Sequence, residues 1–226
     1  MQTDIAIVDY GMGNLRSVQK AIEHVAPGAR IAVTDDPAQV SAAGRVVFPG
    51  QGAMPDCMRE MDARGLRPAV RDAAVEKPFL GICIGLQMLF EWSEEGGVAG
   101  LGILPGKVLR FPQDAMVDVN GARLKVPHMG WNRVYQCGAH PLWEGIEEGA
   151  RFYFVHSYFV QPADSSLVAG SSAYPFAFAC AVARNNLFAV QFHPEKSQAS
   201  GLRLLANFVN WQPALAGADT RARADA

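Results

Sequence analysis

Residues 79–87 decide the fold of this chain: they read Phe-Leu-Gly-Ile-Cys-Ile-Gly-Leu-Gln, an apolar run that passes through Gly-x-Cys-x-Gly into a helical pattern. A sharp strand-to-helix turn requires small residues two positions before and after its central residue, because larger side chains there would collide with neighbouring backbone. We therefore predict a nucleophile elbow that lifts Cys83 above the end of a buried strand. A thiol at a helix N-terminus also faces unpaired N–H groups and the positive end of the helix dipole, which favour the thiolate.

Apolar strand patterns and helical patterns alternate through the first half of the chain. The expected order is a strand at 5–8, a helix after Asn14 in the N-cap position, a strand at 31–33, a helix at 37–43, strands at 46–48 and 78–82, and a helix at 84–91. Such alternation is typical of an α/β fold, which we predict to be an open mixed, mostly parallel sheet flanked by helices. In that fold, ligands bind at the carboxyl ends of the strands.

The second half of the chain is richer in strands. We predict strands at 151–160, 177–183 and 187–192, a hairpin at Asn120-Gly121 and a closing helix at 199–211. No linker or internal repeat divides the chain, so we expect one domain over residues 1–212 and a disordered tail over 213–226.

The overall composition excludes several classes of partner. The 226 residues carry 20 Lys plus Arg against 22 Asp plus Glu, a net charge of -2, so no global field attracts nucleic acid or an anionic membrane. No signal peptide and no run of ~18 apolar residues is present, and we expect a soluble, cytoplasmic protein. Three further cysteines are not flanked by glycines in the Gly-x-Cys-x-Gly pattern of Cys83, and we interpret them as structural or incidental: Cys57, Cys137 and Cys180.

His193 is the best candidate for the base that a cysteine nucleophile requires. It follows the strand predicted at 187–192 and begins His193-Pro194-Glu195. Because Pro194 favours an extended residue before it, the imidazole and the carboxylate two positions later project to the same side. Glu195 can then hold the ring tautomer and stabilise the imidazolium.

The other four histidines are weaker candidates for the base. His24 lies on a predicted helix and His140 in a turn-rich stretch, and we expect both to be solvated. His128 and His156 stay open as alternatives to His193.

A second strand end supplies a candidate oxyanion site. Residues 48–53 read Phe-Pro-Gly-Gln-Gly-Ala and follow a predicted strand, so they should reach the same edge of the sheet as Cys83. An N–H of Gln51 or Gly52, together with that of Ile84, would stabilise the oxyanion of a tetrahedral intermediate.

The motifs at 49–52, 81–87 and 193–195 together resemble, in spacing and order, the class I (triad) glutamine amidotransferases, and the resemblance spans residues 4–211. Further segments resemble the glutaminase subunits of imidazole glycerol phosphate synthases, which belong to histidine biosynthesis: residues 9–15, 127–132, 154–158 and 191–197.

The resemblance implies hydrolysis of glutamine through a cysteine thioester. Cys83 would attack the side-chain amide, His193 would protonate the departing ammonia, and water would then release glutamate. The residues implied to contact the bound glutamine are Gln87, Ser157, Tyr158 and, for its ammonium, Glu95. The resemblance implies neither a cofactor nor a metal.

The resemblance also implies a partner. In this family the ammonia passes to a (β/α)8 cyclase subunit of the same synthase, which makes imidazole glycerol phosphate and an aminoimidazole carboxamide ribotide. The two subunits would form a heterodimer. Asn14, Trp131 and Lys196 lie in family-like segments and are candidates to face the cyclase.

Three alternatives remain at this point. The chain can be the glutaminase of another amidotransferase, a cysteine hydrolase of a related α/β fold, or an inactive interaction subunit. In α/β-hydrolases the acid precedes the histidine, whereas Glu195 follows His193 here. All three triad positions are filled, which argues against an inactive subunit.

Overall fold

A computed structural model of the chain describes residues 3–112, 114, 116–117 and 121–214. Residues 215–226 of the predicted tail and Asn120 of the predicted hairpin lie outside the described residues. Next to that hairpin position, Val117 and Arg123 form an isolated antiparallel bridge.

A block of five parallel strands forms the half of the main sheet that carries the elbow. Its order is β2-β1-β3-β4-β14. The strands are β1 (Ile5–Val8), β2 (Ile31–Thr34), β3 (Arg45–Gly50), β4 (Phe79–Cys83) and β14 (Leu187–Val190). Strands β1, β4 and β14 are buried at every position, as expected for parallel strands covered on both faces.

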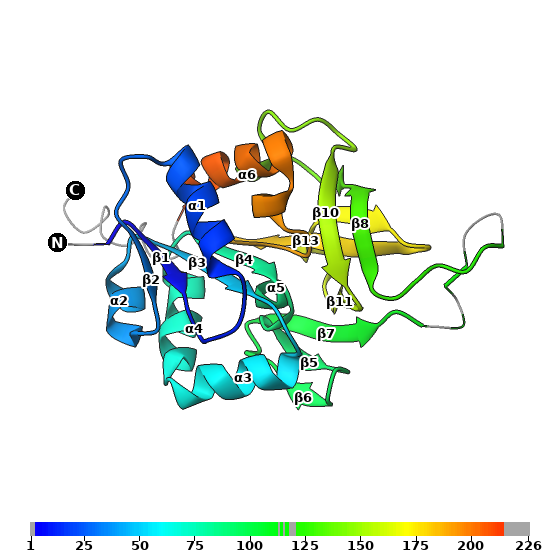
Figure 1. Cartoon of the computed structure of the whole chain (residues 1–226), viewed down its shortest axis with the longest axis horizontal. Helices are drawn as coiled ribbons and strands as arrows, with labels where there is room; N and C mark the ends of the chain where they lie inside the picture. The colour runs from blue at the N-terminus through cyan, green and yellow to red at the C-terminus, as the bar shows by residue number, and fades with distance from the viewer. Residues whose placement is uncertain (1–2, 113, 115, 118–120, 215–226) are drawn as a thin grey trace, which may run out of the picture.

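Helices cover both faces of this block (Figure 1). Helices α1 (Leu15–Val25) and α6 (Gln198–Asn210) pack together on one face, and α2 (Pro37–Ala42), α3 (Met54–Ala63) and α4 (Leu66–Glu76) lie on the other. Asn14 occupies the N-cap position of α1 but makes no side-chain capping bond. The predicted α/β class, a mixed sheet flanked by helices, is confirmed.

The sheet continues into a half whose strand pairs are antiparallel, except for the parallel pair formed by residues 90–93 and 104–110. Strand β13 (Ala177–Arg184) pairs with β14 and is followed across the sheet by β11 (Tyr158–Pro162), β7 (Leu104–Arg110), β5 (Phe90–Ser93) and β6 (Val98–Ala99). Strand β12 (Val168–Ala173) pairs with β13 and with β9 (Tyr135–Gln136). Strands β8 (His128–Arg133) and β10 (Arg151–His156) form a separate antiparallel pair.

Two predicted elements are wrong in extent. The helix expected over 84–91 is only α5 (Ile84–Gln87), because the chain returns to the sheet at Phe90 to pair with β7. The strand expected over 151–160 is interrupted at Ser157: β10 pairs with β8, whereas β11 pairs with β7. Both differences depend on pairing partners distant in sequence.

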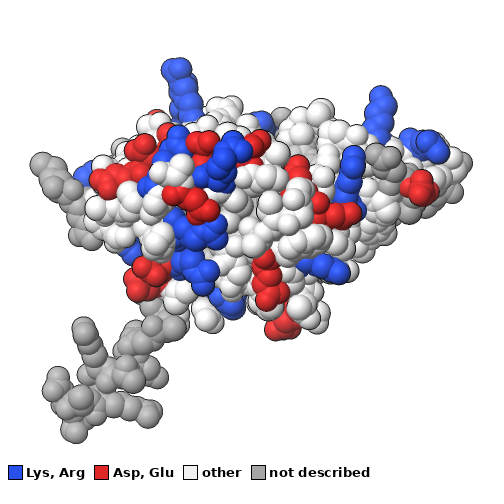
Figure 2. Space-filling view, turned by 90° about the horizontal axis from the view of Figure 1, so that it is seen from below, with Lys and Arg blue, Asp and Glu red and all other residues white. Residues whose placement is uncertain are grey.

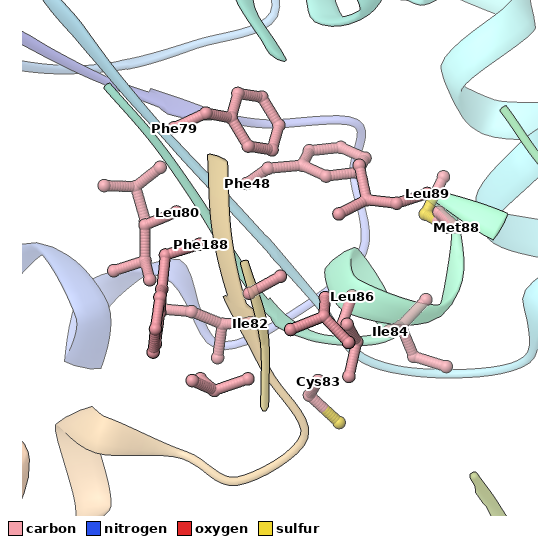
Figure 3. Close-up of a cluster of buried hydrophobic side chains, with 14 of the residues drawn as sticks. Phe48, Phe79, Leu80, Ile82, Cys83, Ile84, Leu86, Met88, Leu89 and Phe188 are labelled. Carbon is pink, nitrogen blue, oxygen red and sulfur yellow. The ribbon is translucent and has the colours of Figure 1, made fainter. Parts of the chain in front are cut away.

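The core beneath the elbow is built from large side chains of adjacent strands. Phe48, Phe79, Leu80 and Phe188 are completely buried there, and Figure 3 shows Cys83 at the margin of this cluster with its sulfur directed away from the aromatic rings. The cluster therefore supports the elbow from below and leaves the sulfur facing outward.

The molecular surface mixes charges of both signs. On the face shown in Figure 2, acidic and basic side chains are interspersed. Helices α3 and α4 contribute local ion pairs, such as Arg64 with Glu60 and Arg67 with Asp62. Within the described residues, no helix has the length and apolar character needed to cross a membrane.

Candidate active site

Cys83 lies at a strained turn between β4 and α5. Its backbone has φ 57° and ψ -111°, a left-handed φ that side-chain-bearing residues rarely adopt. A Cβ on Gly85 would lie 1.8 Å from the carbonyl oxygen of Phe48, and one on Gly81 would lie 2.9 Å from Cβ of Ala189. The two glycines are thus required by close approach, which is the steric reason predicted for them.

His193 and Glu195 form a buried pair. Nδ1 of His193 lies 2.8 Å from Oε1 of Glu195, and each side chain is 2% exposed. The predicted reason for this pairing is only half right: His193 has an extended backbone, but Pro194–Lys196 form a 3-10 turn rather than an extended segment. The backbone N–H of His193 donates to the Tyr153 carbonyl at 2.9 Å, which fixes this turn against β10.

The electrostatics of His193 favour an imidazolium. Burial of the ring lowers its pKa, but the negative charge of the Cys83 thiolate, together with the charge and hydrogen bond of the Glu195 carboxylate, outweighs burial and raises the pKa to about 10. Nε2 of His193 is buried and has no hydrogen-bond partner among the described residues. This nitrogen is therefore the atom available to transfer a proton.

A cavity of about 440 Å³ joins the predicted residues. Nine of the ten line it: Gln51, Gly52, Cys83, Ile84, Gln87, Glu95, Ser157, Tyr158 and His193. The tenth, Glu195, contacts His193 instead. Pro127, Val155, His156 and Lys196 complete the lining. A space of this size accommodates a small amino acid and its reaction intermediates.

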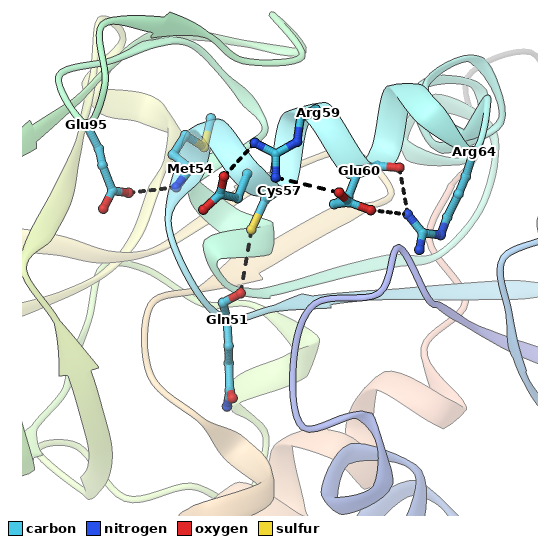
Figure 4. Close-up of polar contacts among 8 residues, drawn as sticks. Gln51, Met54, Cys57, Arg59, Glu60, Arg64 and Glu95 are labelled. Atoms are coloured by element: carbon cyan, nitrogen blue, oxygen red, sulfur yellow. Dashed lines mark hydrogen bonds and ion pairs between the residues drawn. The ribbon is translucent and has the colours of Figure 1, made fainter.

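The candidate oxyanion donors come from two neighbouring segments that line the cavity. Ile84 is the first residue of α5, so its N–H has no partner within the helix. Gly52 has φ 108°, and the Cys57 thiol donates to the Gln51 carbonyl at 3.6 Å (Figure 4). Burial raises the pKa of Cys57 to about 12, so this residue remains a thiol donor at neutral pH.

Glu95 is held in place at the cavity wall. Its Oε2 accepts from the backbone N–H of Met54 at 2.8 Å, as Figure 4 shows, and its own N–H donates to Oγ of Ser93 at 3.2 Å. Glu95 thus presents a positioned carboxylate to the space beside Cys83, which suits an ammonium group.

The other histidines are less suited than His193 to act as the base. His128 and His156 are buried and bond each other at 2.9 Å, and burial lowers their pKa values to about 4 and about 3. His24 is exposed, as predicted. The prediction for His140 is wrong: it is partly buried, its Nδ1 accepts from the Leu142 N–H at 3.1 Å, and burial lowers its pKa to about 4.

Sequence reasoning assigned no role to Gln191, which is completely buried beside Cys83. Its Nε2 lies 3.8 Å from Sγ of Cys83, and its Oε1 accepts from Gln87 at 3.0 Å. The signal that could have found it is the strand predicted at 187–192, whose parallel pairing with the elbow strand places its end next to the nucleophile.

Sequence comparisons identify similar proteins over nearly the whole chain. A model of the glutamine amidotransferase class-I family matches residues 6–211. The chain is 71% identical over 211 residues to the imidazole glycerol phosphate synthase subunit HisH of Aromatoleum aromaticum, covering 93% of this chain and 100% of the relative. It is 69% identical to the subunit of the same name in Thiobacillus denitrificans, covering 94% and 93%.

Solved structures share the fold at low identity. A putative GMP synthase component from Thermoplasma acidophilum matches with a TM-score of 0.66 and 17% identity, covering 93% of this chain and 94% of that one. A glutamine amidotransferase of Thermotoga maritima matches with a TM-score of 0.60 and 14% identity, covering 93% and 84%.

Proposed function

Because the chain belongs to the class-I glutamine amidotransferase family, we propose that it hydrolyses L-glutamine to L-glutamate and ammonia as the glutaminase subunit of an imidazole glycerol phosphate synthase in histidine biosynthesis. The observation that carries this proposal is that Cys83 and His193 line one cavity while Glu195 bonds the far side of the His193 ring. The high identity to two subunits named HisH supports the choice of synthase over other amidotransferases.

The first half of the reaction forms a thioester. The Cys83 thiolate attacks the carbon of the substrate's side-chain amide, and the resulting oxyanion accepts hydrogen bonds from the N–H of Ile84 and of Gln51 or Gly52. The C–N bond then breaks while Nε2 of His193 donates its proton to the leaving nitrogen. Ammonia departs, and the glutamyl group remains on sulfur.

The second half of the reaction hydrolyses the thioester. Water attacks the thioester carbon and gives a proton to Nε2 of His193, which is now neutral. The C–S bond breaks, the thiolate returns, and the product carboxyl ionises to give glutamate. Glu195 holds Nδ1 of His193 through both halves, so the same nitrogen faces the reaction as acid and as base.

An apolar surface beside the cavity is suited to a (β/α)8 cyclase partner. Met129 and Trp131 of β8 are 62% and 43% exposed. They are two residues apart, so their side chains lie on the same face of the strand. Trp131 stands across from Tyr153 of β10, and Lys196 lies 6.0 Å from the Tyr153 ring. Because Lys196 also lines the cavity, a partner bound here would receive ammonia close to where it is released.

The cyclase interface would lie at the carboxyl edge of the parallel strands, where the cavity opens. Exposed aromatic and methionine side chains are enriched at protein interfaces. Asn14 contributes to a small hollow that also includes Gln51 and Glu195, so it lies beside the site as well.

A cytoplasmic location is the remaining part of the proposal. Cys57, Cys83, Cys137 and Cys180 are free thiols, and Cys137 is exposed. Free thiols at the nucleophile and at the surface suit a reducing compartment.

The proposal is tested with Cys83→Ala in complex with a candidate cyclase. This variant should release no glutamate from glutamine, yet the complex should still make imidazole glycerol phosphate from added ammonia, because only the nucleophile is lost. The matched control is Cys137→Ala, which removes an exposed thiol and should leave glutamate release unchanged.

The partner assignment has its own readout. Co-purification with the cyclase, and glutamate release that rises when acceptor nucleotide is added, would support it. Activity of Cys83→Ala near that of the wild type would refute the glutaminase. Binding only to another synthase would redirect the assignment to a different amidotransferase.

A further inference from the structure

Gln191 is placed beside the nucleophile by strand pairing. It directly follows β14, whose Val190 pairs in parallel register with Ile82, the residue before Cys83. Its backbone N–H donates to the Cys180 carbonyl at 2.8 Å, and its side chain is completely buried. A buried amide in this position requires partners for both of its polar ends.

A chain of hydrogen bonds supplies those partners. Nε2 of Gln87 donates to the Tyr158 carbonyl at 3.3 Å and to Oε1 of Gln191 at 3.0 Å. Nε2 of Gln191 then lies 3.8 Å from Sγ of Cys83, within the range of a hydrogen bond to sulfur. The chain runs from one backbone carbonyl, through two side-chain amides, to the reacting sulfur.

The Tyr158 carbonyl determines how the two side-chain amides of this hydrogen-bond chain are oriented. A carbonyl oxygen can only accept, so the Tyr158 carbonyl requires the amide nitrogen of Gln87 to face it. Both hydrogens of that nitrogen are then directed at Tyr158 and Gln191, which requires the oxygen of Gln191 to face Gln87. The nitrogen of Gln191 is left facing Cys83. Reversing Gln87 would place its oxygen against the Tyr158 carbonyl, and reversing Gln191 would place its NH2 group against that of Gln87.

We propose that Gln191 is a catalytic residue of this glutaminase: its amide N–H stabilises the Cys83 thiolate directly, and its amide oxygen fixes the orientation of Gln87 for substrate. The inference rests on the proposed function and deepens it at the same site.

The effect on Cys83 is favourable for the thiolate in particular. Hydrogen bonds to an ionised acceptor are roughly twice as strong as bonds between neutral groups. An N–H held against a buried sulfur therefore stabilises the thiolate more than the thiol. Because the amide is uncharged, it does so without competing with His193 for the proton that leaves with ammonia.

The effect on Gln87 concerns substrate recognition. With both of its N–H groups occupied, Gln87 retains one free polar atom, Oε1, which is buried at the cavity and has no hydrogen-bond partner among the described residues. A fixed acceptor of this kind is satisfied by an N–H of the bound glutamine. Loss of Gln191 would let the amide of Gln87 rotate and would weaken binding.

The test measures alkylation of Cys83 as a function of pH, which requires no glutaminase turnover. Wild type and Gln191→Met are treated with iodoacetamide between pH 5 and 9, and modification of each cysteine is followed by peptide mass spectrometry. Methionine keeps the length and volume of the side chain but removes its donor and acceptor. We expect at least a tenfold slower alkylation of Cys83 near pH 6, with the exposed Cys137 unchanged as an internal reference.

A matched control separates this role from a loss of stability. Asn186 is a buried amide just before β14, and its Nδ2 donates to the Ala74 carbonyl at 3.1 Å, far from the sulfur along the strand. Asn186→Leu should destabilise the fold and leave the pH profile of Cys83 alkylation unchanged. If Gln191→Met fails to fold, Gln191→Asn keeps a buried amide whose reach is too short to bridge Gln87 and Cys83, and we expect the same slowing.

The role toward Gln87 is tested by a double-mutant cycle on glutamine hydrolysis. Gln191→Met should raise the KM for glutamine severalfold in the wild-type background. It should raise the KM little in a Gln87→Met background, because Gln191 acts on the substrate through Gln87. Slower alkylation should persist in both backgrounds.

The outcomes distinguish two kinds of failure. If the wild type releases glutamate but Gln191→Met matches Asn186→Leu in alkylation, the assignment of Gln191 is wrong and the glutaminase stands. If the wild type releases no glutamate with or without a cyclase, the proposed function itself fails, whatever the alkylation profile.

Discussion

Nδ1 of His193 lies 2.8 Å from Oε1 of Glu195, and the pair is buried from solvent, since each side chain is 2% exposed. A carboxylate in this position fixes which ring nitrogen faces Cys83 and stabilises the imidazolium. It does not itself contact the reacting atoms. Its role is therefore one of orientation and charge, which mutation can separate from the role of the ring.

Glu195→Gln should reduce glutamate release less than His193→Ala does. A neutral amide can still partly hold the ring, whereas nothing replaces the missing acid and base. In a comparable triad the carboxylate contributes roughly a hundredfold less than the histidine. Steady-state kcat of both variants in the cyclase complex gives the comparison. The reverse order would remove His193 from its assigned role.

Gly85→Ala should disrupt the elbow. The added Cβ would lie 1.8 Å from the Phe48 carbonyl oxygen, and this backbone atom cannot move without shifting β3. We expect a loss of about 1–3 kcal/mol in the free energy of unfolding and near-complete loss of glutamate release. Gly28→Ala is the control, because a Cβ there meets nothing within 4 Å. Urea denaturation of both variants decides the matter, and equal stability would contradict the steric argument.

The parts of the site that lie in single short segments were predictable from sequence. The elbow around Cys83 and the pair His193 and Glu195 depend on spacings of two residues, which local patterns reveal. Gln191 was not assigned because its contact with Cys83 depends on β14 pairing with β4 across more than a hundred positions. Periodicity within a segment carries no information about that neighbour.

The fold shows the same division. The apolar runs at 5–8 and 78–82 predict two buried strands, which the structure has at 5–8 and 79–83. Helix α3 is not among the predicted elements, although Met54, Met58 and Met61 repeat at helical spacing and are buried. The end of α5 was placed too late, since its length is set by pairing of Phe90 in the sheet. Local sequence patterns therefore predict which segments form strands and helices, but not which strands pair or where each element ends.

Glu95→Gln should raise the KM for glutamine about tenfold with a smaller change in kcat. The carboxylate lines the cavity and is held by the Met54 N–H, so its remaining charge is available to the substrate's ammonium. The side-chain amide introduced by Glu95→Gln still offers an oxygen to the Met54 N–H but carries no negative charge. Glu94→Gln is the matched control: Glu94 is exposed, accepts from the Arg110 N–H at 2.7 Å and does not line the cavity. Equal KM values for the two variants would exclude this role.

His140→Asn should make the fold less sensitive to acid. Burial lowers the pKa of His140 from 6.5 to about 4, so the folded protein resists protonation that the unfolded chain accepts. The contribution of the neutral ring to the free energy of unfolding is fully present above pH 6.5. It decreases as the pH falls from 6.5 towards 4, by at most about 1.4 kcal/mol per pH unit. Asparagine can still cap the Leu142 N–H but does not titrate. Urea unfolding at several pH values should show a shallower slope for the variant, and parallel slopes would contradict the assignment.

The isolated chain should be a poor glutaminase that a nucleotide-loaded cyclase activates. Hydroxyl and thiol donors hold the peptides on either side of the Gly50–Gln51 peptide: Tyr10 donates to the Pro49 carbonyl at 2.9 Å, and Cys57 donates to the Gln51 carbonyl at 3.6 Å. The peptide between them can rotate at small steric cost, because Gly50 has no side chain, and rotation carries the Gln51 N–H into or out of the oxyanion site.

Loss of one oxyanion donor lowers the rate by about 10²–10³, so this rotation alone is enough for a useful gate. Ammonia released without a waiting acceptor is protonated in water and lost, which is the chemical reason for a gate. Glutamate release should therefore be measured for the chain alone, with cyclase, and with cyclase plus acceptor nucleotide, and we expect a rise of at least a hundredfold across the three. Cys83→Ala in the same three states gives the background. Equal turnover in all three would show that the Gly50–Gln51 peptide does not control the reaction and that the site is ungated.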